Sequence, residues 1–353
     1  MPHVPALRLG TVRLKVPPQL GLGLETPPRS LPVLDETRRG ARFIALEVRR
    51  VLNPPAATGM DFWSLNPYVG CEFGCSYCYA RKTHEWVIQR TADNLSAGPP
   101  VRLSAPPSLA FEHEILVKGA APDVLLRTLD PAKLKGTQLL IGTATDPYQP
   151  AERKFLLTRR LLEALLRHRC LSIGIITKSP LVARDIDLLA RVAGRHDLSV
   201  SISLISMDPE LIRKLEARSP APHARIRALA RLTRAGIPAG LMIAPILPGI
   251  TDSWGQLAAL MEAARGAGAR HVHGFPLRLG PSAREGFLPV LEREFPDLVE
   301  RYRRRYGGRV NVEKDYQRAL KQRLRSLRAA FGFVKEAAPL SLLPGMVTGR
   351  IPG

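Results

Sequence analysis

The chain has 353 residues, of which 45% are hydrophobic and 24% charged, and its mean hydropathy is −0.05. That length accommodates one large α/β domain or two small ones, and the lack of any run of about 18 apolar residues excludes a membrane-spanning helix. The formal net charge of +21 favours polyanionic partners, with nucleic acid first among them.

The N-terminal segment, residues 1–45, is rich in Pro, Gly and Leu without a clear period and predicts an irregular leader. Pro2, Pro5 and Arg8 interrupt the first apolar stretches, so no signal peptide is predicted and we expect a cytoplasmic protein without membrane contact. The chain has four cysteines, three of them within eight residues. That distribution is typical of a metal site in a reducing compartment and not of a disulfide framework.

Between residues 46 and 280, short β-branched apolar runs alternate with helical patterns. The predicted strands are 63–69, 114–117, 138–142, 171–177, 198–204, 239–246 and 271–277. The predicted helices are 122–129, 154–168, 181–193, 209–216, 224–235 and 253–267. This alternation predicts parallel strands with helical crossovers, and we expect an α/β core of the partial (β/α)6 TIM barrel type, with a doubly wound open sheet as the alternative. In both folds ligands lie beyond the carboxyl ends of the strands.

Residues 281–335 predict a basic helical extension, and 336–353 a tail. The extension carries a dense series of cations: Arg301, Arg303, Arg304, Arg305, Arg309, Lys314, Arg318, Lys321, Arg323, Arg325 and Arg328. Leu320, Leu324 and Leu327 interrupt this series at helical spacing. They indicate a helix that packs on the core with its charged face in solvent; contact with nucleic acid is the other interpretation.

The segment NPYVGCEFGCSYCYARKTHEW, residues 66–86, spaces its cysteines as Cys71-x3-Cys75-x2-Cys78. Three thiolates on a short loop are able to face one soft or borderline metal site, and glycines at 70 and 74 let the backbone bend around it. On a four-iron cluster they leave one iron open to a small molecule. A Cys₃His zinc site that includes His84 remains the alternative, whereas Cys170 is expected to be an ordinary buried cysteine.

This cysteine spacing, on the first loop of a predicted barrel, resembles the signature of the radical S-adenosylmethionine (SAM) superfamily. The segments GTATDPYQPAE (142–152), ITKSPLVARDIDLLA (176–190) and LEARSPAPHARIRALARLTRAGIPAGLMIAPILPGITD (215–252) resemble its spore photoproduct lyase-like branch. The likeness extends from about residue 47 to about residue 324. It implies a [4Fe–4S] cluster on Cys71, Cys75 and Cys78, SAM bound at the open iron, an external electron donor, and reductive cleavage of SAM to a 5′-deoxyadenosyl radical. The substrate is not implied, although the charge suggests nucleic acid.

The resemblance also implies SAM contacts, beginning with Tyr77 against the adenine and Lys178 on the carboxylate. Thr145 and Asp146 end an apolar strand, so we expect their polar groups at the barrel mouth; a helix N-cap is the other interpretation. For Tyr77 the alternative is packing under the loop, and for Lys178 it is an ordinary surface position.

Three serines alternate along the strand 198–204 and therefore share one face. Of these, Ser201 and Ser203 are expected to contact SAM. Further candidates for SAM contacts are Glu216, Ser219 and Arg225, for which a structural set of salt bridges and caps is the other interpretation. No catalytic residue is singled out.

Thr143 occupies the position at which spore photoproduct lyases carry a hydrogen-donating cysteine. This difference argues against the lyase reaction but not against radical generation. The competing hypothesis is a zinc-containing, non-catalytic nucleic-acid-binding protein.

Overall fold

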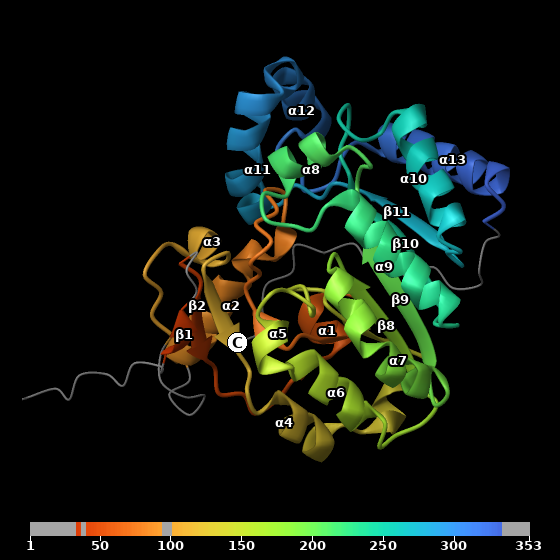
Figure 1. The fold of residues 1–353 in the computed structure, drawn as a ribbon. Helices are drawn as coiled ribbons and strands as arrows, with labels where there is room; N and C mark the ends of the chain where they lie inside the picture. Colours follow the sequence, from red (N-terminus) through yellow and green to blue (C-terminus); the bar gives the residue numbers. More distant parts are fainter. Residues whose placement is uncertain (1–32, 37–39, 94–100, 334–353) are drawn as a thin grey trace, which may run out of the picture.

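The computed structural model describes residues 33–36, 40–93 and 101–333 (Figure 1). Its main sheet has the strand order β11-β10-β9-β8-β7-β4-β3. Six neighbouring strands of it run parallel: β4 (Trp63–Leu65), β7 (Gln138–Ile141), β8 (Ser172–Thr177), β9 (Asp197–Ser203), β10 (Ala239–Ile246) and β11 (Val272–Pro276). The short β3 (Leu52–Asn53) pairs antiparallel with β4, so β3 and β11 remain edges within the described chain. The predicted partial (β/α)6 barrel is thereby confirmed.

Helices cover the outside of this sheet, as Figure 1 shows. They are α4 (Ala121–Thr128), α6 (Leu157–Leu165), α7 (Ile186–Ala193), α9 (Pro222–Arg234) and α10 (Trp254–Gly266). Both faces of strand β9 are buried. Leu198, Val200 and Ile202 belong to the core shared with these helices, whereas Ser201 and Ser203 lie on the opposite face, toward the barrel interior. None of the helices in the described ranges has the length and apolarity needed to cross a bilayer.

A second, smaller sheet corrects two predictions. Its order is β1 (Val33–Glu36), β2 (Arg42–Ala45), β6 (Glu114–Val117) and β5 (Tyr68–Val69). The predicted irregular leader 1–45 is therefore wrong for 33–36 and 42–45, because Phe43 and Ile44 bury apolar side chains against this sheet. Residues 1–32 and the predicted tail 336–353 lie outside the described residues.

The predicted strands 63–69 and 114–117 do not both belong to the barrel. Segment 63–69 divides into β4 and β5 around Pro67, which has no N–H to continue a ladder. After this break β5 pairs antiparallel with β6, so 114–117 stabilises the small sheet instead of the barrel. The loop that leaves β5 carries the three cysteines.

The basic extension consists of α11 (Pro281–Glu294), α12 (Val299–Tyr306) and α13 (Lys314–Ala330). Helix α11 lies directly on the cysteine loop: a Cβ at Gly286 would come within 2.4 Å of the Ser76 carbonyl oxygen. Helix α13 packs against β11 and α10 through the buried side chains Leu320, Leu324 and Leu327. The prediction of a packing helix with an apolar seam is confirmed.

Candidate functional site

The cysteine loop is held in place by close packing against His84 and Phe111. Gly70 and Gly74 have φ angles of 95° and 63°, a region that favours glycine. A Cβ at Gly70 would also meet the His84 ring at 2.9 Å. Cys71 N–H donates to the Phe111 carbonyl at 2.9 Å, and all three cysteines share one apolar cluster with Phe111. The backbone of this loop therefore has one well-defined path.

Burial raises the pKa of each of the three thiols, Cys71, Cys75 and Cys78. Lys178 opposes this shift at Cys75 and Cys78. Thiols in such surroundings stay protonated until a metal displaces the proton, and three of them around one apolar patch suit a soft, thiolate-bound group. The donor set therefore fits the iron–sulfur cluster that the resemblance implies.

His84 does not join these thiols. Its Nε2 lies 2.8 Å from the Glu114 carbonyl oxygen, and its fully buried ring packs edge-on to Phe111 with centroids 5.7 Å apart. His84 is therefore tied to the backbone of β6, and the Cys₃His zinc site remains the alternative interpretation of these four residues.

A buried ionic network lies beside the loop and is centred on Glu216, which is 1% exposed. Its carboxylate accepts hydrogen bonds from the Tyr77 hydroxyl, from Arg225 and, at 2.7 Å, from Ser219 Oγ. Lys178 Nζ lies 3.5 Å from the same carboxylate. Burial alone would raise the pKa of Glu216, but Arg225 and Lys178 lower it to about 2. Glu216 is therefore ionised at neutral pH.

Lys178 connects this network to the barrel interior. Its Nζ donates to Ser203 Oγ at 2.9 Å and lies 5.8 Å from the centre of the Tyr77 ring. Burial favours the neutral amine, yet the ionised Glu216 raises the pKa of Lys178, so it stays a cation. Three of the predicted contact residues, Tyr77, Lys178 and Ser203, are thus brought together.

Thr145 and Asp146 lie next to this group but use their side chains within the protein. Asp146 accepts from Thr177 Oγ1 at 2.6 Å, from the backbone N–H of Lys178 at 2.7 Å and from that of Tyr148 at 2.9 Å. Thr145 Oγ1 donates to the Gly70 carbonyl at 2.5 Å. Both residues therefore fix the cysteine loop and the end of β8.

Ser201 and Gln149 differ from what the sequence led us to expect. Ser201 Oγ lies 3.2 Å from Nε2 of His271, away from Lys178, because the register pairs Ser201 with Gly240, over which the His271 ring is packed. Gln149, which sequence reasoning missed, donates to the Gly70 carbonyl at 3.1 Å and accepts from Glu72 N–H at 3.0 Å. The sequence signal that could have identified Gln149 is its position in the segment 142–152, which resembles the lyase-like branch.

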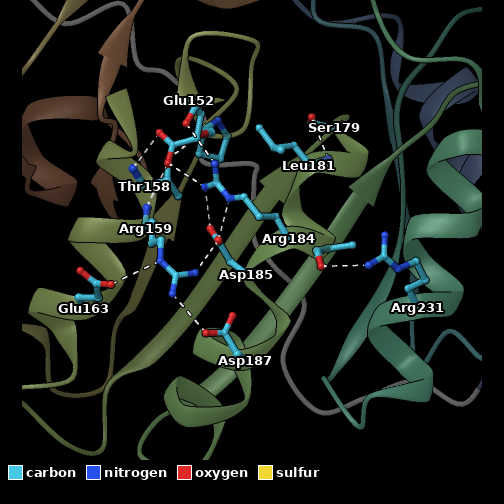
Figure 2. A network of polar contacts seen from close by, with 12 residues as sticks. Glu152, Thr158, Arg159, Glu163, Ser179, Leu181, Arg184, Asp185, Asp187 and Arg231 are labelled. Carbon is cyan, nitrogen blue, oxygen red and sulfur yellow. Dashed lines mark hydrogen bonds and ion pairs between the residues drawn. The ribbon is translucent and has the colours of Figure 1, made fainter. Parts of the chain in front are cut away.

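A second polar network is built around Glu152 and Asp185 (Figure 2), and it anchors the strand before the cysteines through Tyr68. Glu152 accepts from the Tyr68 hydroxyl at 2.6 Å and from Thr158 N–H at 3.0 Å, and Arg184 reaches it at 3.4 Å. Arg184 also pairs with the fully buried Asp185 at 2.8 Å, as Figure 2 shows. Strand β5 is thereby tied to α6 and to the segment that follows β8.

Tyr68→Phe is expected to lower the free energy of unfolding by about 1–2 kcal/mol, because the buried Glu152 carboxylate loses a short hydrogen bond. Urea denaturation of the two proteins measures the difference. The matched control is Glu163→Gln, since Glu163 is half-exposed and pairs with Arg159 at 3.5 Å; its cost should stay below about 1 kcal/mol. Equal costs for both changes would contradict the anchoring role of Tyr68.

Comparison with known proteins agrees with this geometry. Residues 65–261 match the family model of the Radical SAM superfamily. The uncharacterized protein Rv2578c of Mycobacterium tuberculosis is 33% identical over 302 residues, which are 85% of this chain and 84% of that protein. The chain therefore belongs to the radical SAM superfamily, as the cysteine spacing predicted, and it is a radical SAM enzyme. An uncharacterized protein of Methanocaldococcus jannaschii is similar at 28% identity over 60% of this chain and 70% of its own length.

Solved structures show the same fold. Spore photoproduct lyase complexed with dinucleoside spore photoproduct superimposes with a TM-score of 0.56 at 18% identity, over 82% of this chain and 79% of the lyase chain. A double mutant of that lyase, with bound AdoMet and dinucleoside spore photoproduct, gives the same TM-score of 0.56 over the same shares of the two chains. The resemblance to the lyase branch is thus confirmed for the fold.

Proposed function

We propose that Cys71, Cys75 and Cys78 hold a [4Fe–4S] cluster and that SAM binds beside it, between the loop and the carboxyl ends of β8 and β9. The observation that carries this proposal is the position of Lys178 and Ser203 next to the cysteine loop, with Lys178 held by Glu216. When bound, the reduced cluster would supply an electron to the sulfonium of SAM and so yield a 5′-deoxyadenosyl radical.

The protein side of this chemistry is electrostatic. Two cations, Lys178 and Arg225, share the single carboxylate of Glu216, which leaves one positive charge in excess among these three groups. A ligand carboxylate near Lys178 would balance that charge through a charge-assisted hydrogen bond. Glu216 would keep Arg225 as its partner when Lys178 turns to the ligand, so the network tolerates ligand binding without exposing an unpaired charge.

The neighbouring residues have supporting roles in the proposal. Tyr77 offers its ring to one side of the ligand, and Ser203 offers a hydroxyl. Asp146 and Thr145 hold the two backbone segments that frame the site. Ser201 lies with His271, so its part in binding SAM is indirect.

The reaction beyond radical formation follows from what surrounds the site. Thr143 Oγ1 accepts from Asn66 Nδ2 at 3.2 Å and brings no thiol to the position after β7, so we do not propose photoproduct repair. Besides Cys71, Cys75 and Cys78, the chain has one further cysteine, Cys170. It is exposed, so the prediction that it is buried is wrong. We therefore propose an external electron donor, with hydrogen abstraction from a separate substrate.

Anaerobic reconstitution of the full chain with iron and sulfide tests the proposal. We expect about four irons per chain, and conversion of SAM to methionine and 5′-deoxyadenosine when a strong reductant is added. Iron-free protein that leaves SAM intact would contradict it, and stoichiometric zinc in protein prepared in air and in anaerobic protein alike would favour the zinc alternative.

Lys178→Met is expected to weaken SAM binding by about 10- to 100-fold, since a charge-assisted hydrogen bond of about 1.5–3 kcal/mol is lost. Iron content should be unchanged, because Lys178 binds no metal in the proposal. Equilibrium dialysis of SAM against reconstituted protein measures the affinity. Lys133→Met serves as the control, since Lys133 is exposed and pairs loosely with Asp130 at 3.9 Å. Wild-type affinity in the Lys178 variant would remove this residue from the site.

A further inference from the structure

Helix α13 carries six cations and one acid in seventeen residues. Four of the cations, Lys314, Arg318, Lys321 and Arg325, follow one another at steps of four, three and four residues and are all exposed. At 3.6 residues per turn such steps place them on one face of the helix. We call these four residues the α13 stripe.

The α13 stripe contributes little to the stability of the fold. Buried cations elsewhere have acidic partners, as Arg225 has Glu216 and Arg81 has Glu112. On the stripe, the one ion pair recorded among the described residues joins Arg318 to Asp315, and both side chains are largely exposed. Such a pair adds little stability, whereas like charges four residues apart cost a few tenths of a kcal/mol each. The charge pattern therefore indicates an anionic partner and not a structural need.

The length of the stripe indicates the kind of anion. From Lys314 to Arg325 the helix advances about 16 Å, over which one strand of a B-form duplex carries about five phosphates. A small metabolite would satisfy only one or two of the four cations. A membrane surface is a poorer match, because the apolar face of α13 is already buried on the core through Leu320, Leu324 and Leu327 and has nothing left to insert into lipid.

The position of α13 links this surface to the barrel. The helix packs on β11, the edge strand of the main sheet, where Leu324 covers Gly274 closely enough that a Cβ there would lie 2.8 Å from it. Figure 1 shows α13 beside α10 in the same outer layer. We propose that the α13 stripe binds the sugar–phosphate backbone of nucleic acid, without sequence preference, alongside the edge of the barrel.

This inference goes beyond radical generation and is tested without SAM or reductant, so its failure is distinguishable from failure of the proposed function. The probe is a fluorescein-labelled oligonucleotide, used as single strand, as duplex and as the matching RNA, and anisotropy gives its affinity for the full chain over a range of salt. The stripe variant changes all four cations, Lys314, Arg318, Lys321 and Arg325, to Gln. The control variant changes four exposed arginines on other helices to Gln: Arg127, Arg160, Arg191 and Arg234.

Both variants lose the same charge, so only the location differs. The stripe variant should bind the oligonucleotide at least about tenfold more weakly, and the slope of log affinity against log salt should fall by about 3 to 4, one contact per lost cation. The control variant should keep most of the affinity and slope. A charge-conserving variant, with Lys and Arg exchanged at the four stripe positions, should bind like the wild type, because phosphate contacts need charge and not one particular side chain.

Thermal unfolding of each variant confirms that it is folded before affinities are compared. Equal weakening by the stripe and control variants would show that net charge alone governs binding and would overturn the proposal. An unchanged salt slope in the stripe variant, or no binding by the wild type at low salt, would overturn it as well.

Discussion

Cys75→Ala, reconstituted without air, is expected to hold no stoichiometric iron–sulfur cluster and to cleave no SAM. The change removes one of three thiols from an apolar patch in which Nε2 of His84 is held by the Glu114 carbonyl, and Cys170 is exposed on the segment before β8. Two thiolates would leave two irons of a four-iron cluster without a protein ligand.

Cys71→Ala and Cys78→Ala should behave in the same way, whereas Cys170→Ala should match the wild type in iron and activity. Iron and sulfide analysis, together with chromatographic detection of 5′-deoxyadenosine, measures both properties. Wild-type iron in the Cys75 variant, or loss of the cluster in Cys170→Ala, would show that the ligands are not the three proposed.

Glu216→Gln is expected to lower the free energy of unfolding by about 3–5 kcal/mol. The change leaves the guanidinium of Arg225 fully buried without a counter-charge, and a buried ion that loses its partner keeps its whole desolvation cost. The double variant Glu216→Gln/Arg225→Met should recover part of that loss, because no unpaired charge remains. Glu300→Gln is the control: Glu300 is exposed, and its pair with Arg303 at 3.7 Å should contribute less than about 1 kcal/mol.

The same carboxylate makes stability depend on acid pH. The pKa of Glu216 falls from 4.5 to about 2 on folding, so its contribution is complete above about pH 4.5 and disappears as the pH drops toward 2. Urea denaturation between these limits should show a decline in the wild type that is shallower in the Glu216→Gln variant. Parallel pH profiles for the two proteins would contradict an ionised Glu216 in the folded state.

Sequence reasoning located the cysteine loop and the strand ends because both leave local signals. Cysteine spacing is read directly, and alternation along β9 separates Ser201 and Ser203 from the apolar face. Alternation along a strand does not show, however, how far into the barrel each serine lies or which residues it contacts. The register of β9 against β10 pairs Ser203 with Met242 and Ser201 with Gly240, and this places one serine beside Lys178 and the other under His271.

Contacts between distant segments were beyond such reasoning. Gln149 meets Gly70 across 79 positions of the chain, and β2 finds its parallel partner β6 about 70 residues later. Neither pairing leaves a periodic pattern, because each depends on where the whole chain has already folded. The predicted leader was wrong for the same reason: its residues 33–36 and 42–45 become strands only when the small sheet provides partners.

The close packing of Gly286 on Ser76 bears on the predicted domain boundary at residue 280. The predicted boundary at residue 280 falls between the barrel and α11, yet α11 buries Phe287 and Leu291 completely and covers the backbone of the cysteine loop. A chain truncated after residue 280 would lack this cover over the loop and would expose an apolar surface in its place. Helix α11 is therefore part of the packing around the cysteine loop.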